Sequence, residues 1–210
     1  MYDLLIKNGH VVDGSGNPWF RADIAVNGGK IVRIARGLEG AKVTLDAGGR
    51  IVSPGFIDAH THSDFPLLAN PKAESKIHQG VTTEVVGSCG GWLAPVLGEA
   101  AEHVGQQVAR FPGFVVDWTS TRGYLERLDS QGIALNVVPL VGFGSARAAV
   151  MGFAERPATA DERRKMRALV EQNIDEGAFG MSTGLFYAPQ SFAPTDEVVD
   201  VAKGLKPKEA

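Results

Sequence analysis

The sequence predicts an α/β fold: an N-terminal small β-sandwich domain over residues 1–54, followed by the first half of a (β/α)8 TIM-type barrel over residues 55–210. The first segment consists of short apolar runs separated by glycine-rich turns, which is typical of short β-strands. In the second segment the pattern helix, glycine, apolar strand, glycine recurs, as expected for consecutive strand–helix units of a parallel sheet. We count about four such units where a closed barrel needs eight, so half a barrel is predicted.

Four apolar runs predict the strands of the β domain. The sequence Asn27-Gly28-Gly29 is a turn signal between the second run and the third. The runs are centred on Leu4-Leu5-Ile6, on Ile24 and Val26, on Ile31-Val32 and Ile34, and on Val43 and Leu45.

The barrel segment begins after Pro54-Gly55, where Phe56–His60 is the first predicted strand. Asn70-Pro71 places a helix cap and a first-turn proline before a short helix that ends at Gly80. The next predicted strand is Val81–Gly87.

Two longer helices separate the remaining strands. One runs from about Thr119 to Ser130 and precedes a strand over 133–138. The other begins at Thr159, which together with Glu162 matches a capping box, and its apolar positions recur at helical spacing. The fourth strand, Ala178–Ser182, follows it.

Composition narrows the classes of partner. With 44% hydrophobic and 21% charged residues, the chain has the composition of a soluble globular protein. A formal charge of −3 without a basic block argues against nucleic acid as a partner. The sequence contains neither a signal peptide nor an apolar run long enough to span a membrane. A single cysteine suits a reducing compartment, so a cytoplasmic location is predicted.

The most distinctive local feature is the pair His60 and His62 at the end of the first barrel strand. Side chains at i and i+2 of a strand point to the same face, so both imidazoles can reach one cation. Neutral imidazole is a good zinc ligand. The alternative is two partly exposed histidines that hydrogen-bond to backbone or water. The flanking context, an apolar strand entered through Pro-Gly and left through Ser-Asp, favours the metal site.

The only cysteine, Cys89, lies just beyond the second barrel strand. A thiolate there would be a strong zinc ligand. The alternative is a small buried apolar side chain, the common fate of a free cysteine. The neighbouring glycines favour an irregular loop over a packed core.

Polar residues also follow the third and fourth strands. Ser182, Thr183 and Tyr187 could donate hydrogen bonds to a substrate carbonyl or carboxylate, or could be turn and capping residues. Arg147, in the loop over 142–147, could clamp a carboxylate or be a solvated surface arginine. Catalytic residues of such barrels collect at the carboxyl ends of the strands. Because each feature follows a predicted strand, together they indicate one site.

These motifs resemble the amidohydrolase superfamily and, within it, the N-acyl-D-amino-acid deacylase (D-aminoacylase) family. The run from Pro54 to Asp58 that leads into the two histidines is similar to the metal motif of the superfamily. Two further stretches are similar to motifs of the deacylase family, and the resemblance extends to about Val201. These stretches are Gly80-Val81-Thr82-Thr83 with Ser88-Cys89-Gly90, and Ser182-Thr183-Gly184-Leu185 with Tyr187 and Pro189.

The resemblance implies a role for each residue. Cys89 would hold a tightly bound zinc, while His60 and His62 would lie in or beside the position of a second, weaker divalent metal. Tyr187 would be catalytic by polarising the scissile carbonyl. The other expected site residues are Ser182 and Arg147 in substrate binding, and Asp58 and Asp64 in support of the ligands.

The chain departs from the pattern of this family at three positions. Phe143 stands where histidine is usual, Ser88 where asparagine is common, and Gln190 where glycine often follows the proline. The first change removes a polar group near the site and bears on substrate preference.

For a complete protein the resemblance implies hydrolysis of a small-molecule N-acyl amino acid. Zinc would lower the pKa of a bound water towards about 7 and polarise the carbonyl, and a carboxylate from later in the barrel would move the proton. No histidine follows His103, so further ligands are expected on later strands. The chain ends where the family enters its fifth strand, and we therefore expect it to be inactive alone.

Two alternatives remain. A cyclic-amide hydrolase of the hydantoinase or dihydropyrimidinase type also opens with His-X-His, but it bridges two metals with a modified lysine on the fourth strand. The predicted fourth strand, 178–182, has no lysine. The other alternative is a non-catalytic, truncated half-barrel that pairs with the missing C-terminal half or with itself, because open strand faces and edges favour assembly.

Overall fold

The computed structural model describes residues 1–109, 111 and 115–205. They form two compact units; the first is Met1–Gly55 and the second begins at Phe56. Each unit contains its own β-sheet. Residues 206–210, with which the predicted barrel segment ends, lie outside the described residues.

The sheet of the first unit has five strands in which every predicted apolar run is found. Its order is β3-β2-β1-β4, and β5 also pairs with β1. The pairs β1–β2 and β2–β3 are antiparallel, whereas β4 and β5 run parallel to β1. The strands are β1 (Tyr2–Val11), β2 (Phe20–Asn27), β3 (Lys30–Ala35), β4 (Ala41–Asp46) and β5 (Ile51–Val52). The turn predicted at 27–29 joins β2 to β3.

This unit is a single layer within the described residues. Small apolar clusters form around Leu5 and Ala25, and around Val11 and Ile24. Other strand side chains stay exposed, among them Ile31 at 62%. The second layer of the expected sandwich stays a prediction, and the exposed apolar residues of this sheet are available to it.

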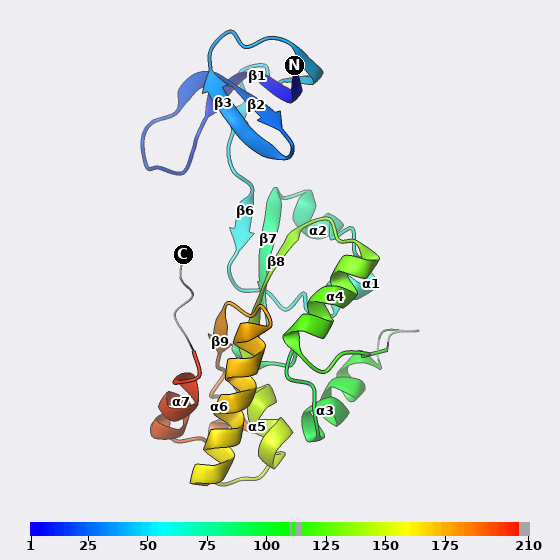
Figure 1. The fold of residues 1–210 in the computed structure, drawn as a ribbon, viewed down its shortest axis with the longest axis vertical. Coiled ribbons are helices and arrows are strands. Elements are labelled where there is room, and N and C mark those ends of the chain that lie inside the picture. Colours follow the sequence, from blue (N-terminus) through cyan, green and yellow to red (C-terminus); the bar gives the residue numbers. More distant parts are fainter. Residues whose placement is uncertain (110, 112–114, 206–210) are drawn as a thin grey trace. The chain divides into compact units, whose positions relative to one another are not determined.

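The second unit contains four parallel strands in chain order, β6-β7-β8-β9 (Figure 1). The strands are β6 (Phe56–Asp58), β7 (Val81–Val86), β8 (Asn136–Gly142) and β9 (Gly180–Ser182). Within the described part of the chain, β6 and β9 each pair with one neighbour only, so the sheet is open at both edges. This arrangement is the predicted half of a strand–helix barrel.

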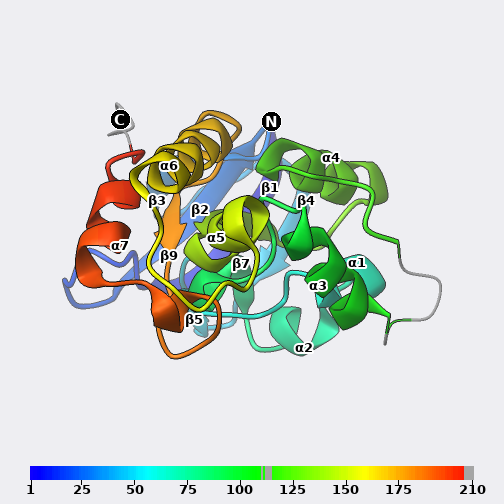
Figure 2. The ribbon, with the colours of Figure 1, turned by 90° about the horizontal axis from the view of Figure 1, so that it is seen from below.

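Helices connect these strands and bury one face of the sheet. Val86 of β7 packs with Tyr124 and Leu128, while Val141 of β8 packs with Met166. Helices α5, α6 and α7 lie side by side (Figure 2). The helices are α1 (Pro66–Ala69), α2 (Glu74–Ile77), α3 (Glu99–Val108), α4 (Thr121–Gln131), α5 (Phe143–Met151), α6 (Ala160–Asp175) and α7 (Thr195–Ala202), with short 3₁₀ turns η1 (Ser88–Gly90) and η2 (Gln190–Phe192). None of the helices in the described ranges has both the length and the apolar character needed to cross a lipid bilayer.

Three local expectations are corrected. Asn70 ends α1 and does not cap α2, whose N-cap is Ala73 in a left-handed conformation. Residues 143–151 form helix α5 and not a loop, and six of its residues are buried. Strand β8 begins at Asn136, three residues later than predicted, because residues 133–135 precede the pairing with β7.

Candidate metal centre

The two histidines follow β6 at the carboxyl end of the sheet. The carboxylate of Asp58 accepts the backbone N–H of His60 at 3.3 Å. The backbone N–H of Thr61 donates to the carbonyl of Val85 at 3.3 Å, which ties this segment to β7. The rings of His60 and His62 are exposed, with centroids 5.6 Å apart and planes at 74°. Both therefore remain accessible for coordination.

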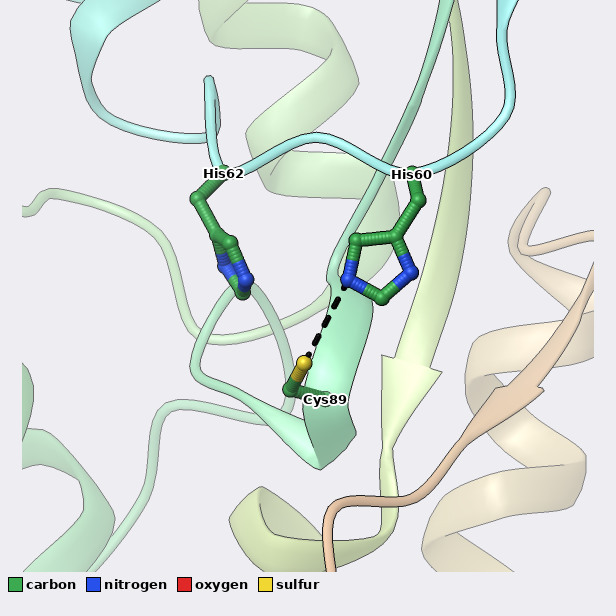
Figure 3. Close-up of side chains that lie close together, drawn as sticks. All are labelled: His60, His62 and Cys89. Atoms are coloured by element: carbon green, nitrogen blue, oxygen red, sulfur yellow. Dashed lines mark hydrogen bonds between the residues drawn. The ribbon is translucent and has the colours of Figure 1, made fainter.

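Cys89 lies in the short turn η1 that follows β7. Its backbone is left-handed, with φ 59° and ψ 28°. The thiol Sγ lies 3.4 Å from Nε2 of His60, and one ligand atom from each of His60, His62 and Cys89 lies within 4.8 Å of the others. Figure 3 shows both imidazoles extending from one stretch of chain towards the sulfur. The structure thus brings together the three side chains that the sequence singled out.

This donor set fits a zinc-sized ion. Zinc takes imidazole nitrogen and thiolate sulfur at about 2.0–2.3 Å, so tetrahedral ligand atoms lie about 3.5 Å apart. The 3.4 Å separation between Cys89 and His60 matches that spacing. The ligand atom of His62 lies within 4.8 Å of the other two.

Asp58 is the last residue of β6, two positions before His60, and it forms an ion pair. Lys76 of α2 approaches its carboxylate at 2.6 Å and also contacts the buried Glu84 at 3.1 Å. The hydrogen bond from the Lys76 ammonium lowers the pKa of Asp58, with a further contribution from the His60 backbone N–H. Asp58 therefore stays ionised and holds the backbone of His60.

Asp64 joins the histidine segment to the end of β7. Its buried carboxylate accepts the backbone N–H of Gly87, and its carbonyl accepts the hydroxyl of Tyr124 at 2.9 Å. Burial raises the pKa of this carboxyl group. Asp64 thus fixes the segment that carries His62 relative to the loop that carries Cys89.

A cavity of about 350 Å³ opens beside the cluster. Trp92, Gln107 and Gln190 line it, although the sequence did not indicate them as site residues. Trp92 lies close after Cys89 in the chain and could have been suspected. Gln107 belongs to α3, a helix that was not predicted. The other lining residues are His62, Asp64, Phe65, Pro66, Ser88, Cys89, Gly91 and Tyr187.

Ser182 is the last residue of β9, and Tyr187 lies in the segment after it. The two hydroxyl groups differ in whether they are free to bind a ligand. Tyr187 is 54% exposed and borders the cavity, where its hydroxyl can meet a ligand. The hydroxyl of Ser182 instead donates to the carbonyl of Gly87 and accepts the backbone N–H of Gly90 at 2.9 Å. Because a serine has one hydroxyl hydrogen, Ser182 cannot also donate to a substrate. Its observed role is to hold the Cys89 loop.

Arg147 is neither a substrate clamp nor a surface residue. Its side chain is wholly buried, and Nε pairs with Glu197 of α7 at 2.9 Å. The remaining guanidinium nitrogens donate to backbone carbonyls, including that of Pro189 at 2.9 Å. The expectation fails because Arg147 lies on the buried helix α5, where its charge requires an internal partner.

Phe143 is also buried, in the cluster that contains Val141. Its ring therefore fills the core at the start of α5.

The fold and the cluster together define a class: a strand–helix barrel protein with two histidines and a cysteine gathered at the carboxyl ends of its first strands. The chain belongs to the Amidohydrolase family, whose sequence model it matches over residues 43–206.

Curated relatives point to one branch of this family. The chain is 42% identical to an N-acyl-D-aspartate deacylase and 39% identical to a D-aminoacylase, both from Alcaligenes xylosoxydans xylosoxydans. Each match covers 97% of this chain but only 41% and 42% of the relative. The chain thus spans about two fifths of the length of these proteins.

Solved structures with high similarity to this chain belong to the same branch of the family. A D-aminoacylase described by its binuclear metal centre superimposes with a TM-score of 0.84 at 36% identity, over 97% of this chain and 43% of that chain. An N-acyl-D-glutamate deacylase from Bordetella bronchiseptica, complexed with zinc and a phosphonate inhibitor, gives 0.84 at 34% identity, over 97% and 42%. An L-hydantoinase from Arthrobacter aurescens gives 0.54 at 21% identity, over 96% and 38%, which is a likeness of fold alone.

Proposed function

We propose that the protein to which this chain contributes is a zinc-dependent hydrolase that removes the acyl group from N-acyl-D-amino acids. The observation that carries the proposal is the convergence of His60, His62 and Cys89 beside a cavity bordered by Tyr187. The deacylase relatives support the reaction, and the zinc-containing deacylase structure supports the metal.

The chemistry of the residues is consistent with this reaction. A zinc ion bound here would supply Lewis acidity for a water molecule and for the acyl carbonyl. Cys89, as a thiolate, and the two imidazoles would hold it. The Tyr187 hydroxyl would donate a hydrogen bond to the acyl oxygen. Trp92 would shield one side of the cavity from water.

We further propose that the 210-residue chain binds metal but does not turn over substrate by itself. The described sheet has four strands and two open edges, so part of the wall around the cavity is absent from it. Besides a zinc held by three protein ligands, hydrolysis requires a general base within hydrogen-bond reach of the water. Asp58 and Asp64 are both engaged in holding backbone.

The test compares metal content and hydrolysis. Zinc should remain with the purified chain after dialysis and should be lost from a His60→Ala/His62→Ala/Cys89→Ala variant, whereas the exposed His78→Ala control should retain it. Release of free amino acid would be measured from N-acetyl-D-aspartate, N-acetyl-D-glutamate and N-acetyl-D-methionine, with the L-enantiomers as controls.

Hydrolysis of the D-substrates should appear when the remaining barrel strands are supplied, either in one chain or as a second polypeptide. Equal zinc retention by the triple variant would refute the metal assignment. Zinc-dependent hydrolysis by the isolated chain would refute its proposed inactivity, and hydrolysis of L-substrates alone would refute the substrate class.

A further inference from the structure

The backbone of Cys89 has a left-handed conformation, which is intrinsically unfavourable for a residue other than glycine. Such a conformation persists only where the surroundings determine it. Relaxation to a right-handed conformation would carry the thiol away from His60. The contacts that hold the turn therefore also hold the ligand.

Gln190 makes the contact with the Cys89 backbone. Its side chain is 1% exposed, and Nε2 donates to the carbonyl of Cys89 at 3.1 Å. On the other side of the same amide, Oε1 accepts the backbone N–H of Gly184 at 2.7 Å. One buried amide thus connects the Cys89 turn to the segment after β9.

The amide lies in a slot formed by glycines. A Cβ atom at Gly90 would lie 2.0 Å from Oε1 of Gln190, and one at Gly144 would lie 2.7 Å from Nε2. A Cβ atom at Gly184 would lie 2.2 Å from the Cys89 carbonyl oxygen. Side chains at these positions would displace the amide or the turn, so the slot matches the glutamine closely.

The base of Gln190 is anchored as well. Arg147, which pairs with the buried Glu197, donates to the carbonyl of Pro189, the preceding residue. Ser182 holds the turn on either side of Cys89, through Gly87 and Gly90. These contacts leave the Gln190 amide little freedom to move.

We propose that Gln190 is a positioning residue for the ligand Cys89. The inference rests on the proposed metal centre and deepens it: the amide fixes the Cys89 carbonyl, which fixes the turn and places the thiol near His60. A residue without a side-chain amide at this position, such as glycine, could not make this contact.

The experiment uses Co²⁺ as the probe with the full chain and its Gln190→Ala and Gln190→Glu variants. Glutamate keeps the volume and the acceptor for Gly184 but loses the donor to Cys89. Gln131→Ala is the matched control, because Gln131 also donates to a backbone carbonyl, that of Leu68, outside the candidate centre. Cobalt affinity, the thiolate-to-cobalt absorption band at saturation and the unfolding midpoint would be measured.

Both Gln190 variants should bind cobalt about 10- to 100-fold more weakly, the usual effect of losing support around a ligand, with a smaller thiolate band per bound ion. The Gln131 control should match the wild type. Unchanged affinity and band in both variants would overturn the proposal, and so would a lower unfolding midpoint with an unchanged band. By contrast, absence of the thiolate band in the wild type would refute the metal centre itself.

Discussion

Cys89 supplies the softest donor atom of the candidate centre. Replacing this residue tests whether its thiol binds the metal or only fills space in the loop. Cys89→Ala should abolish tight zinc retention, whereas Cys89→Ser should weaken it, because a neutral hydroxyl is a much poorer zinc ligand than a thiolate. Metal content after dialysis measures both effects. If the alanine variant retained its zinc, Cys89 would be a packing residue only.

The buried pair of Arg147 and Glu197 allows a test of stability that can be made on the metal-free chain. Arg147→Met should cost about 3–5 kcal/mol, because it leaves the carboxylate of Glu197 buried without its partner. Arg147→Met/Glu197→Leu should recover part of that loss, because the unpaired charge is removed while the backbone groups that the pair satisfied stay unpaired. Urea unfolding measures the difference, and Arg164→Met, which removes an exposed partner of Asp161, is the control. If Arg147→Met were as stable as the wild type, the charge of Arg147 would not be needed to pair with the buried Glu197.

For single residues, the sequence predicted which side chains gather after neighbouring strands, but it did not predict ion pairs between distant helices. Strand β6 ends at Asp58, so His60 and His62 lie after the strand and not on it as predicted, but their ligand atoms still meet that of the cysteine that follows the adjacent strand. The partner of Arg147 lies 50 residues away, on a helix that was not predicted. No local pattern could show that the guanidinium is already occupied.

Among the elements, α6 begins with the capping box that the sequence predicted. The Thr159 side chain accepts the N–H of Glu162, and the Glu162 carboxylate accepts the N–H of Thr159. Arg156 also pairs with that carboxylate at 2.7 Å. These contacts, the Arg156 hydrogen bond first, lower the pKa of Glu162 from 4.5 to about 2.

Acid should therefore weaken the start of α6. A carboxyl group whose pKa is lower in the folded state stabilises the fold above pH 4.5, and that contribution disappears as the pH falls to about 2. Glu162→Gln should cost about 1 kcal/mol at pH 7, a modest value because Arg156 is half exposed. Urea unfolding from pH 7 to pH 2.5 should show this difference shrinking.

Glu155→Gln removes an equal charge from an exposed position and should show no such trend. A difference between Glu162→Gln and the wild type that did not change with pH would contradict the assignment.

Two of the helices that the sequence missed lack the periodic pattern by which a helix is recognised. Helix α5 is buried on most sides and contains glycine, so it lacks the alternation of polar and apolar positions that identifies α6. Helix α1 has only four residues, too few to show a period. Helices α3 and α7 were missed as well, although each has a buried and an exposed face; neither begins with a side-chain cap like that of α6.

For the whole molecule, the open half-barrel predicts self-association of the isolated chain. Ile57 on β6 is 66% exposed, and Phe179 beside β9 is 65% exposed, next to unpaired strand edges. Light scattering after size exclusion should show a mass that rises with concentration. Ile57→Lys should reduce the association, whereas Val115→Lys, at a position 70% exposed outside the sheets, should not. A monomer at every concentration would contradict the prediction.

The contact between Gln190 and Cys89 joins residues 101 positions apart, and this separation has a consequence for synthesis. A ribosome adds about 5–20 residues per second, so roughly 5 to 20 s pass between the appearance of the thiol and that of the amide that holds it. During this interval the nascent chain carries its histidines and its thiol without the support of the later segment. An oxidant or a competing soft metal ion would reach the sulfur most easily then, so the order of translation and metal loading would be part of how the proposed centre is made.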